Sequence, residues 1–397
     1  MSLLQGTVTI LYRINFSGRG EISMDEIKYF GFYDSMLGRR SMSMAAVNKM
    51  NYICQAISSN GKKVRIIACG MGAEENIAAC EENIQENISV KYFNTKKSSK
   101  YRIFHLINLL RRNIILFKYI IKNVSENETI IVYHSLALMR CLWLAKKIKK
   151  FRMVLEVEEI YNDVILKSDR ARQREVEFIQ LADAYVFPTG LLNSELNKTG
   201  KPYVIIHGTY KAEPEIAEKP ADGKIHIVYA GTFDPRKGGG LAAAAAEYLP
   251  YNYHVHILGF GSDDEIKMMK DKIEEVNAKS EATVTYDGLL SGAEYTKFLQ
   301  SCDIGLSTQN PDAAFNATSF PSKILSYMAN GLRVVSIRIP AISESGVGSS
   351  VYYYDTQTPQ NIAEAIKSIN LNDDYNGREI IVELDKQFRS EITQLIE

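Results

Sequence analysis

The chain has 397 residues, of which 46% are hydrophobic and 24% are charged, a composition typical of a globular protein with two or three domains. Lysine plus arginine and aspartate plus glutamate each number 47, so no overall positive field indicates a nucleic-acid-binding protein. The five cysteines are scattered without a CxxC pair, which argues against a disulfide framework or a zinc site and favours a reducing cytoplasm.

Short apolar runs alternate with helical patterns through the first half of the chain. Nearly continuous runs rich in Val, Ile and Tyr are typical of strands buried in a parallel sheet. The predicted strands are residues 7–13, 63–69, 89–93, 129–134, 152–157, 184–188 and 202–206. Their alternation with helices predicts an α/β, Rossmann-like, doubly wound domain over residues 1–208.

One long segment, residues 15–40, separates the first predicted strand from its helix and is expected to be a loop. Loops of this length are usually functional or disordered, and one at the carboxyl end of a parallel strand would face a ligand. Gly18, Arg19 and Gly20 are therefore candidate lid or acceptor-binding residues, with plain disorder or an inserted helix as the alternative. The stretch lacks the third glycine of GxGxxG, so no dinucleotide site is predicted.

The second half begins after a polar stretch with two prolines, residues 209–224, which predicts an interdomain linker or a long surface loop. Strand runs then resume, at residues 224–231, 253–259, 282–288, 303–308, 333–337 and 350–354. They predict a second Rossmann-like domain over residues 225–375 and a closing helix over 376–397. Ser291 and Glu294 have the spacing of a capping box and predict a helix start.

Two motifs of the second half suggest an anion site. YAGTFDPRKGGG, residues 229–240, follows a strand and precedes an alanine-rich helix, so its glycines and the helix N-terminus can approach a phosphate. Arg236 and Lys237 add charge, although a basic turn shaped by glycines is the alternative.

The second motif is TSFPSKILSYMANG, residues 318–331, which predicts a helix that Ser319 or Ser322 could cap. Lys323 falls in its first turn, where a cation opposes the helix dipole. A bound diphosphate would explain that charge, and together the two motifs predict a nucleotide diphosphate between the domains.

With these motifs, the sequence resembles the GT-B glycosyltransferases, specifically glycosyltransferase family 4 (group 1) of polysaccharide assembly. The resemblance rests on VYAGTFDPRKGG, YHVHILGFGSDD, DGLLSGAEYTKFLQSCDIGLST and FPSKILSYMANGLRVVS, and covers the C-terminal half best. It implies two parallel-sheet domains facing a cleft, a nucleotide-sugar donor on the second and a glycan or lipid-linked acceptor on the first. It also implies a retaining transfer that serves surface polysaccharide or glycolipid synthesis.

Individual residues carry the resemblance into the donor site. Lys237 falls on the family lysine that holds the donor phosphates, and Gly231 and Gly238 match the turn glycines. Thr232 stands where the family often has an arginine, so the resemblance leaves the remaining cations of the two motifs to bind the diphosphate.

The family's acidic pair is missing. Many members carry two glutamates separated by seven residues, and Thr318 and Ser326 occupy those positions here. Because the second glutamate usually bonds the ribose, Ser326 puts ribose recognition in doubt. Asn310, Asp312 and Asn316 precede the motif, and we expect either contact with the sugar or ordinary turn chemistry.

The catalytic candidates come from strand ends of the first domain. His134 ends one predicted strand, while Glu158 and Glu159 follow another. A buried structural histidine and a solvated helix start are the alternatives. Cations would stabilise the leaving diphosphate, so we expect neither a metal ion nor a cofactor apart from the nucleotide sugar as substrate.

Basic, apolar segments at residues 96–102, 109–113, 116–123 and 142–152 predict either a face that sits on anionic lipid or ordinary solvated helices. No signal sequence and no spanning apolar run are apparent, so the expected location is the cytoplasm with contact to the inner face of the membrane. The main alternative to an enzyme is a non-catalytic GT-B subunit that binds a nucleotide sugar for a transferase complex. A GT-B epimerase would need several carboxylates around the sugar, which the sequence does not show.

Overall fold

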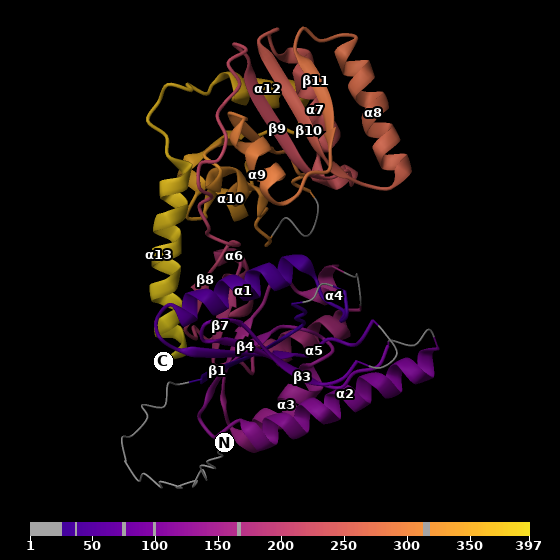
Figure 1. Cartoon of the computed structure of the whole chain (residues 1–397), viewed down its shortest axis with the longest axis vertical. Helices are drawn as coiled ribbons and strands as arrows, with labels where there is room; N and C mark the ends of the chain where they lie inside the picture. Colours follow the sequence, from indigo (N-terminus) through magenta and orange to yellow (C-terminus); the bar gives the residue numbers. More distant parts are fainter. Residues whose placement is uncertain (1–25, 36–37, 74–76, 98–100, 165–167, 313–317) are drawn as a thin grey trace, which may run out of the picture.

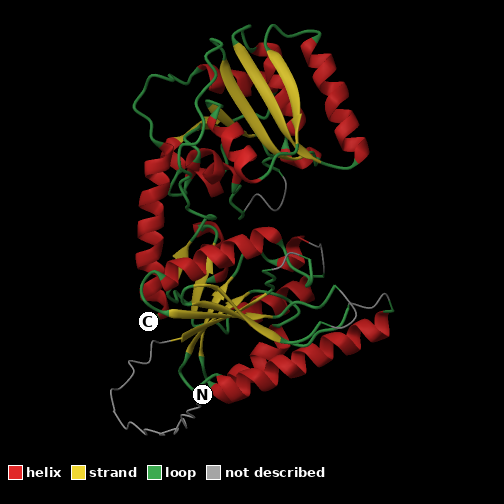
Figure 2. Ribbon diagram, in the orientation of Figure 1, coloured by secondary structure: helices red, strands yellow, loops and turns green. Residues whose placement is uncertain are grey.

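The computed structural model describes residues 26–397 apart from residues 36–37, 74–76, 98–100, 165–167 and 313–317. Two α/β domains lie one above the other, and each is built on its own sheet (Figure 1). Figure 2 shows helices on both faces of the lower sheet, which is the arrangement of a doubly wound domain.

The first domain has an eight-stranded sheet in the order β3-β4-β2-β1-β5-β6-β7-β8. Its strands are β1 (Glu26–Gly31), β2 (Lys63–Ala68), β3 (Cys80–Gln85), β4 (Ile88–Tyr92), β5 (Thr129–Tyr133), β6 (Arg152–Glu156), β7 (Ala184–Phe187) and β8 (Tyr203–Ile205). All neighbours are parallel except β3, which pairs antiparallel with β4. This edge strand, CEENIQ, is too polar to stand out as a buried strand in the sequence, so the sheet is mixed rather than purely parallel.

The expected loop over residues 15–40 is wrong for residues 26–31, because these residues form β1 in the middle of the sheet. Tyr29 pairs with Ile66 of β2, and Phe30 pairs with Val132 of β5. The charged residues of EIKYFG hid the strand from a pattern search, but Lys28 is ion-paired with Glu128 at 2.6 Å. The predicted strand at residues 7–13 and the candidates Gly18, Arg19 and Gly20 lie outside the described residues.

Helices cover both faces of the first sheet. They are α1 (Met44–Ser58), α2 (Arg102–Asn123), α3 (Met139–Lys149), α4 (Tyr161–Val164), α5 (Asp169–Ile179) and α6 (Gly190–Leu196). Alternate residues of β1 point to opposite faces: Tyr29 packs in one core with Met50 of α1, while Phe30 packs in another with Leu116 of α2 and Phe178 of α5.

The second domain has a six-stranded sheet in the order β11-β10-β9-β12-β13-β14, and every pair of neighbours is parallel. Its strands are β9 (Ile225–Thr232), β10 (Tyr253–Phe260), β11 (Thr283–Gly288), β12 (Ile304–Ser307), β13 (Arg333–Ile337) and β14 (Val351–Tyr354). Its helices are α7 (Gly239–Ala244), α8 (Asp263–Asn277), α9 (Gly292–Gln300), α10 (Lys323–Ala329), α11 (Pro340–Ser343) and α12 (Pro359–Lys367), with short 3-10 turns at η1 (Pro235–Lys237), η2 (Ala245–Tyr248) and η4 (Gly348–Ser350).

The predicted helix is present, but the capping box predicted at its start does not form. Helix α9 begins after Ser291, but the Ser291 hydroxyl makes no capping bond within the described residues. Gly292 has a φ of +56°, which departs from the helical first turn that a capping box requires. The capping box forms instead at α8, between Ser262 and Glu265.

Two segments join the domains. Residues 206–224 contain neither helix nor strand and lead from the first sheet to the second. Helix α13 (Gly377–Ile396) returns to the first domain, as Figure 1 shows, where Phe388 stacks on Tyr52 of α1 with ring centres 5.5 Å apart. None of the helices in the described part of the chain combines the length and apolarity needed to cross a bilayer.

Candidate functional site

Lys323 is the first residue of α10, and its ammonium group lies under the end of β9. Its Nζ is 4.1 Å from the centre of the Tyr229 ring, and a β-carbon on Gly231 would come within 3.1 Å of it. The Nζ atom is buried, and no group in the described part of the chain forms a hydrogen bond with it. Burial, with the charge of Lys237 as a second cause, lowers the pKa of Lys323 to about 7. A bound anion would supply the compensation that this charge lacks.

The loop after β9 brings a second cation to the same place. Asp234 caps η1 by accepting a hydrogen bond from the backbone of Arg236, and Gly238 ends it with a φ of +80°. A β-carbon on Gly238 would lie only 1.7 Å from the carbonyl oxygen of Thr308, so glycine is required by both backbone conformation and space. Lys237 precedes it, is half-buried, and has a pKa lowered mainly by that burial.

Arg236 and Thr232, two further predicted donor-binding residues, make their hydrogen bonds within β9 and the loop that follows it. The exposed Arg236 guanidinium donates three hydrogen bonds to the Asp234 carboxylate, of 3.0 and 3.1 Å from Nε and 2.6 Å from an Nη, and lowers the pKa of Asp234 to about 2. Thr232 ends β9, and its carbonyl accepts a hydrogen bond from Tyr229. The donor-binding roles predicted for both residues stay predictions.

Neither of the two positions noted in the sequence carries a carboxylate, Thr318 before α10 and Ser326 within it. Ser326 is half-buried and lies near the Tyr295 hydroxyl, whose pKa it lowers against the larger effect of burial. Thr318 instead meets the first domain, since its carbonyl accepts a 2.6 Å hydrogen bond from Thr189. Ser322 is exposed and makes no side-chain cap among the described residues. Asn316 lies outside the described residues.

The first domain presents Glu158 and Glu159 after β6. Glu158 is ion-paired with the buried Lys49, which also donates a 3.2 Å hydrogen bond to the carbonyl of Ile206. Glu159 is half-buried, and burial followed by the charge of Glu158 raises its pKa, while Lys237 of the other domain acts in the opposite direction. Glu159 therefore lies within electrostatic range of Lys237, across the domain junction.

Glu156 belongs to this cluster but was missed in the sequence. It is the last residue of β6, fully buried, and accepts a hydrogen bond from the Tyr29 hydroxyl. Burial and the nearby charge of Glu158 raise the pKa of Glu156 to about 8. A glutamate inside the apolar run MVLEV was the available signal, because a buried carboxyl needs a partner.

His134 is buried at 1% exposure, away from solvent. Its ring stacks between Tyr161 and Phe178, with ring centres 5.2 and 6.3 Å away, and its Nε2 is 3.4 Å from Glu175. Burial lowers its pKa to about 4, so the ring is neutral at pH 7. The catalytic role predicted for His134 stays a prediction.

His207 connects the domains and was also missed. Its Nδ1 donates a 2.7 Å hydrogen bond to the carbonyl of Pro188, and its Nε2 accepts a bond of 3.4 Å from the backbone of Gly346. Its ring lies 4.7 Å from that of Phe320, in the segment before Lys323. The contact fixes the position of that segment against the first domain.

A family model matches the second half of the chain, and solved structures match nearly the whole chain. Residues 224–372 match the family model described as glycosyl transferases group 1. The chain has no match among curated proteins.

Several solved structures share the two-domain arrangement. A trehalose-6-phosphate protein from E. coli bound with UDP-2-fluoro glucose has a TM-score of 0.64 at 11% identity, over 94% of this chain and 97% of that one. The α,α-trehalose 6-phosphate synthase of Burkholderia multivorans has a TM-score of 0.64 at 11% identity, over 93% and 94%. HepE of Anabaena, in complex with UDP and glucose, has a TM-score of 0.58 at 14% identity, over 94% and 97%. The chain therefore has the GT-B fold with two Rossmann-like domains, as the resemblance implied.

Proposed function

We propose that the protein is a glycosyltransferase that moves a sugar from a nucleotide-diphosphate sugar to a glycan or lipid-linked acceptor. The second domain would bind the donor, because it holds the lysine pair and is the part that matches glycosyl transferases group 1. Solved structures with the same fold hold UDP-2-fluoro glucose or UDP with glucose, which supports a nucleotide sugar as donor. The finer assignment is to family 4, with retention of configuration and a role in surface polysaccharide or glycolipid synthesis.

The single observation that carries the proposal is the buried ammonium of Lys323 beside Lys237. Two neighbouring cations raise each other's energy, and burial of one without an anion is unfavourable. A diphosphate would neutralise both charges and accept hydrogen bonds from them. The glycines on either side of η1 support this, since Gly231 leaves space beside Nζ and Gly238 lets the loop approach Thr308.

The reaction would proceed as a substitution at the sugar C1, with the acceptor approaching on the face that the diphosphate leaves, so that the configuration is retained. The bond from C1 to the diphosphate oxygen breaks, the acceptor oxygen bonds C1, and the acceptor proton passes to a base. We assign this base to Glu159, because it is half-buried, has a raised pKa and interacts with Lys237 of the donor domain. The lysines would stabilise the charge on the departing diphosphate, so the proposed chemistry needs no metal ion.

A second candidate is a GT-B subunit that binds a nucleotide sugar without turnover. The observation that favours it is Ser326, which lies near the Tyr295 hydroxyl in the helical turn where related enzymes often carry a glutamate. Nucleotide binding without donor breakdown is the result that this candidate requires.

For the acceptor, we propose that α2 and α3 place the protein on anionic lipid at the inner face of the cytoplasmic membrane. Large apolar side chains of α2 are exposed, and they are Ile103, Phe104, Leu106, Ile107, Leu110 and Ile114. Trp143, Leu144 and Ile148 extend this surface on the neighbouring α3. Figure 1 shows the two helices side by side on the side of the first domain that faces away from the second.

The positive charge of α2 and α3 favours anionic lipid as the binding partner of this surface. Neither α2 nor α3 contains an acidic residue, while Arg111, Lys118, Lys122, Arg140 and Lys147 are exposed on them. A helix pair with an apolar face and only positive charge is typical of segments that lie in an anionic membrane interface. A lipid-linked acceptor would then be within reach of the first domain.

The function is tested with a thermal-shift series in UDP, GDP, dTDP and CMP, followed by a donor screen that detects released nucleotide. We expect one nucleoside diphosphate to raise the melting temperature, and its sugar conjugates to release nucleotide slowly in the absence of acceptor. No shift with any nucleotide would contradict both candidates. A shift without release, and without transfer to glycan or lipid extracts, would favour the binding subunit.

A further inference from the structure

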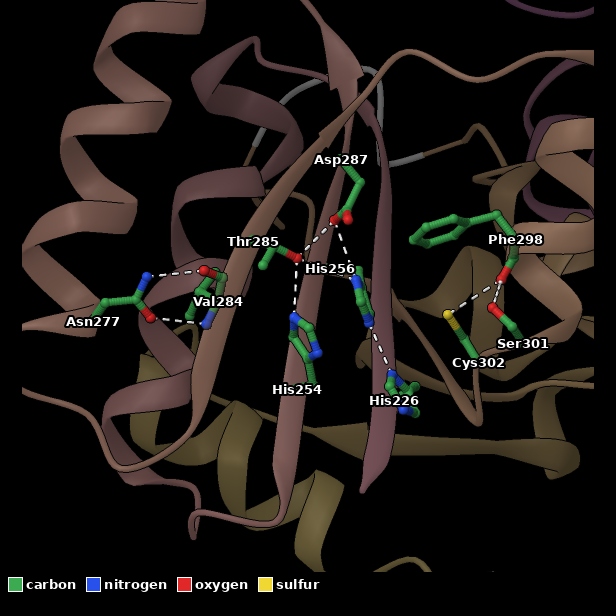
Figure 3. A network of polar contacts seen from close by, with 10 residues as sticks. All are labelled: His226, His254, His256, Asn277, Val284, Thr285, Asp287, Phe298, Ser301 and Cys302. Carbon is green, nitrogen blue, oxygen red and sulfur yellow. Dashed lines mark hydrogen bonds and ion pairs between the residues drawn. The ribbon is translucent and has the colours of Figure 1, made fainter. Parts of the chain in front are cut away.

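A cluster of three histidines lies on the sheet of the second domain, at the other end of its strands from the lysine pair. His226 is on β9, and His254 and His256 are on β10. The sheet register pairs His226 with His254, and His256 lies two residues further along, so all three side chains share one face. One ring nitrogen of each residue lies within 4.8 Å of the others, as Figure 3 illustrates.

The hydrogen bonds around two of these rings determine where their protons are. Nε2 of His226 is 3.2 Å from an oxygen of Asp222, and Nδ1 of His256 is 3.2 Å from an oxygen of Asp287. Since ionised carboxylates only accept hydrogen bonds, both of these nitrogens carry a proton. The remaining nitrogens, Nδ1 of His226 and Nε2 of His256, therefore present lone pairs to each other at 2.9 Å. Such an arrangement is repulsive unless a cation lies between them.

The hydrogen bonds of the third ring, His254, determine the position of its proton in the same way. The hydroxyl of Thr285 donates a 2.9 Å hydrogen bond to Asp287, so its oxygen accepts from Nε2 of His254 at 3.1 Å. This bond leaves Nδ1 of His254 unprotonated. In Figure 3 that nitrogen lies on the side of the ring that faces His226 and His256. The His254 ring lies over that of His256, with ring centres 3.9 Å apart and planes 31° from parallel. Rotation of the His254 side chain would bring this third lone pair to the other two.

We propose that His226, His254 and His256 bind a divalent transition-metal ion, with Zn²⁺ as the best match. Imidazole nitrogens suit zinc, and bond lengths near 2.0–2.1 Å require ligand nitrogens about 3.3 Å apart in a tetrahedral site. The 2.9 Å pair is already close to that spacing, and rotation of the His254 ring out of its stacked position on His256 would complete the site. A water molecule would take the fourth position.

The surroundings resemble the outer shell of a metal site. Asp222 and Asp287 hold the proton-bearing nitrogens of two ligands, which is the carboxylate–histidine arrangement that orients imidazoles toward zinc. Phe298 of α9 packs edge-on against His256, with ring centres 5.2 Å apart, and shields that side. The ion can enter from the other side, because His254 is half-buried and Asp222 is exposed.

The proposed ion would not act on the sugar. His226 precedes Gly231 by five residues along β9, a separation of about 16 Å, so the ion would lie well away from the lysine pair. Its effect is to join β9 to β10 and, through Asp287 and Thr285, to β11. Metal binding here is therefore independent of sugar transfer.

The test uses the full chain with its purification tag removed, because tag histidines also bind these ions. Calorimetry with ZnCl₂ after chelator treatment and desalting should give one site per chain with a dissociation constant in the micromolar range or below. Co²⁺ in place of Zn²⁺ should give the visible absorption of a tetrahedral complex. His254→Gln should weaken binding at least about tenfold, and its side-chain amide can still donate to Thr285, so the fold is preserved.

Two further variants make the result specific. Asp287→Asn should weaken Zn²⁺ binding about 10- to 100-fold by loosening His256, as the loss of an outer-shell carboxylate does. His105→Gln removes a histidine of α2 in the other domain and should leave affinity and stoichiometry unchanged. Absence of Zn²⁺ binding at about 0.1 mM by the wild-type chain would overturn the proposal, and so would full binding by His254→Gln. A wild-type chain that remains metal-free would instead place a shared proton between His226 and His256.

Discussion

The ammonium of Lys323 lies 4.1 Å from the centre of the Tyr229 ring, and no carboxylate among the described residues pairs with it. A cation–π contact compensates part of the loss of water around the charge, but burial still lowers the pKa of Lys323 to about 7. The lysine is thus poised to become fully charged when an anion arrives beside it.

We expect Lys323→Met to weaken binding of the recognised nucleoside diphosphate about 10- to 100-fold, because a charge-assisted hydrogen bond contributes about 1.5–3 kcal/mol. Binding of the corresponding nucleoside, which has no phosphate, should change less than about twofold by the same measure. Calorimetry on both ligands tests this, with the exposed Lys279→Met as the control that keeps both affinities. Equal losses for the nucleoside and its diphosphate would show that Lys323 does not contact phosphate.

Affinity for the diphosphate should also fall as the pH rises above 7. The free protein loses the Lys323 proton near that pH, while a bound diphosphate would hold it, so binding takes up a proton in this range. Titrations between about pH 7.5 and 9 should therefore show weakening binding for the wild-type chain and a smaller change for Lys323→Met. The same pH slope in both proteins would contradict the assignment.

Gly238→Ala should destabilise the protein more than Gly223→Ala. Both glycines have positive φ, +80° and +73°, and the left-handed conformation alone disfavours alanine by about 1–2 kcal/mol. Only at Gly238 would the new β-carbon also meet backbone, 1.7 Å from the oxygen of Thr308. Urea denaturation measures the difference, and Gly238→Ala should also lose diphosphate affinity because the loop that carries Lys237 must move. Equal destabilisation by the two changes would contradict the packing argument.

Stability should depend on pH through Glu156. Its carboxyl has a pKa of about 8 in the folded chain and an ordinary value near 4.5 when unfolded, so the folded state binds the extra proton between these values. The stability that this proton provides is complete below about pH 4.5 and is lost as the pH rises through 8. Glu156→Gln imitates the protonated form, so we expect its stability advantage over wild type to grow by about 1–2 kcal/mol between pH 7 and 9.

A second variant separates this effect from other groups that titrate in the same range. Tyr29→Phe removes the hydrogen bond that Tyr29 donates to Glu156 and that favours the ionised carboxyl. The loss of stability should then move to higher pH rather than disappear. A constant difference between Glu156→Gln and wild type across this range would show that Glu156 does not titrate there.

Membrane contact should depend on the apolar face of α2. The wild-type chain should sediment with vesicles that contain anionic lipid and much less with neutral vesicles. Leu110→Glu, at a side chain that is 62% exposed, should reduce sedimentation at least about fivefold, since it adds negative charge and removes apolar area. Met268→Glu on α8, 66% exposed in the other domain, is the matched control and should sediment as wild type does. Equal sedimentation of the Leu110 and Met268 variants would contradict the proposed surface.

Much of the fold could be predicted from local patterns alone. Runs such as those of β5, β6 and β13 are nearly continuously apolar because parallel strands are buried on both faces, and the glycines and cations around β9 pointed to an anion. Local signals failed where polar residues belong to the sheet. EIKYFG forms the central strand β1, where Glu128 neutralises the charge of Lys28. CEENIQ forms β3, because the side chains of an edge strand can remain exposed to solvent on one face.

What the sequence determined by itself was therefore most of the alternation of strands and helices and the division into two α/β domains, since these follow from short-range periodicity and composition. The GT-B class and the roles of the motif residues were implied by the family resemblance. Only the tertiary structure decided that Lys323 is buried beside Gly231 and that Glu156 lies close to the charged side chains of Lys49 and Glu158. It also decided that His226 lies against the two histidines of β10. These relationships depend on strand register and on burial by distant segments, and both are settled when residues far apart in the chain are packed against each other.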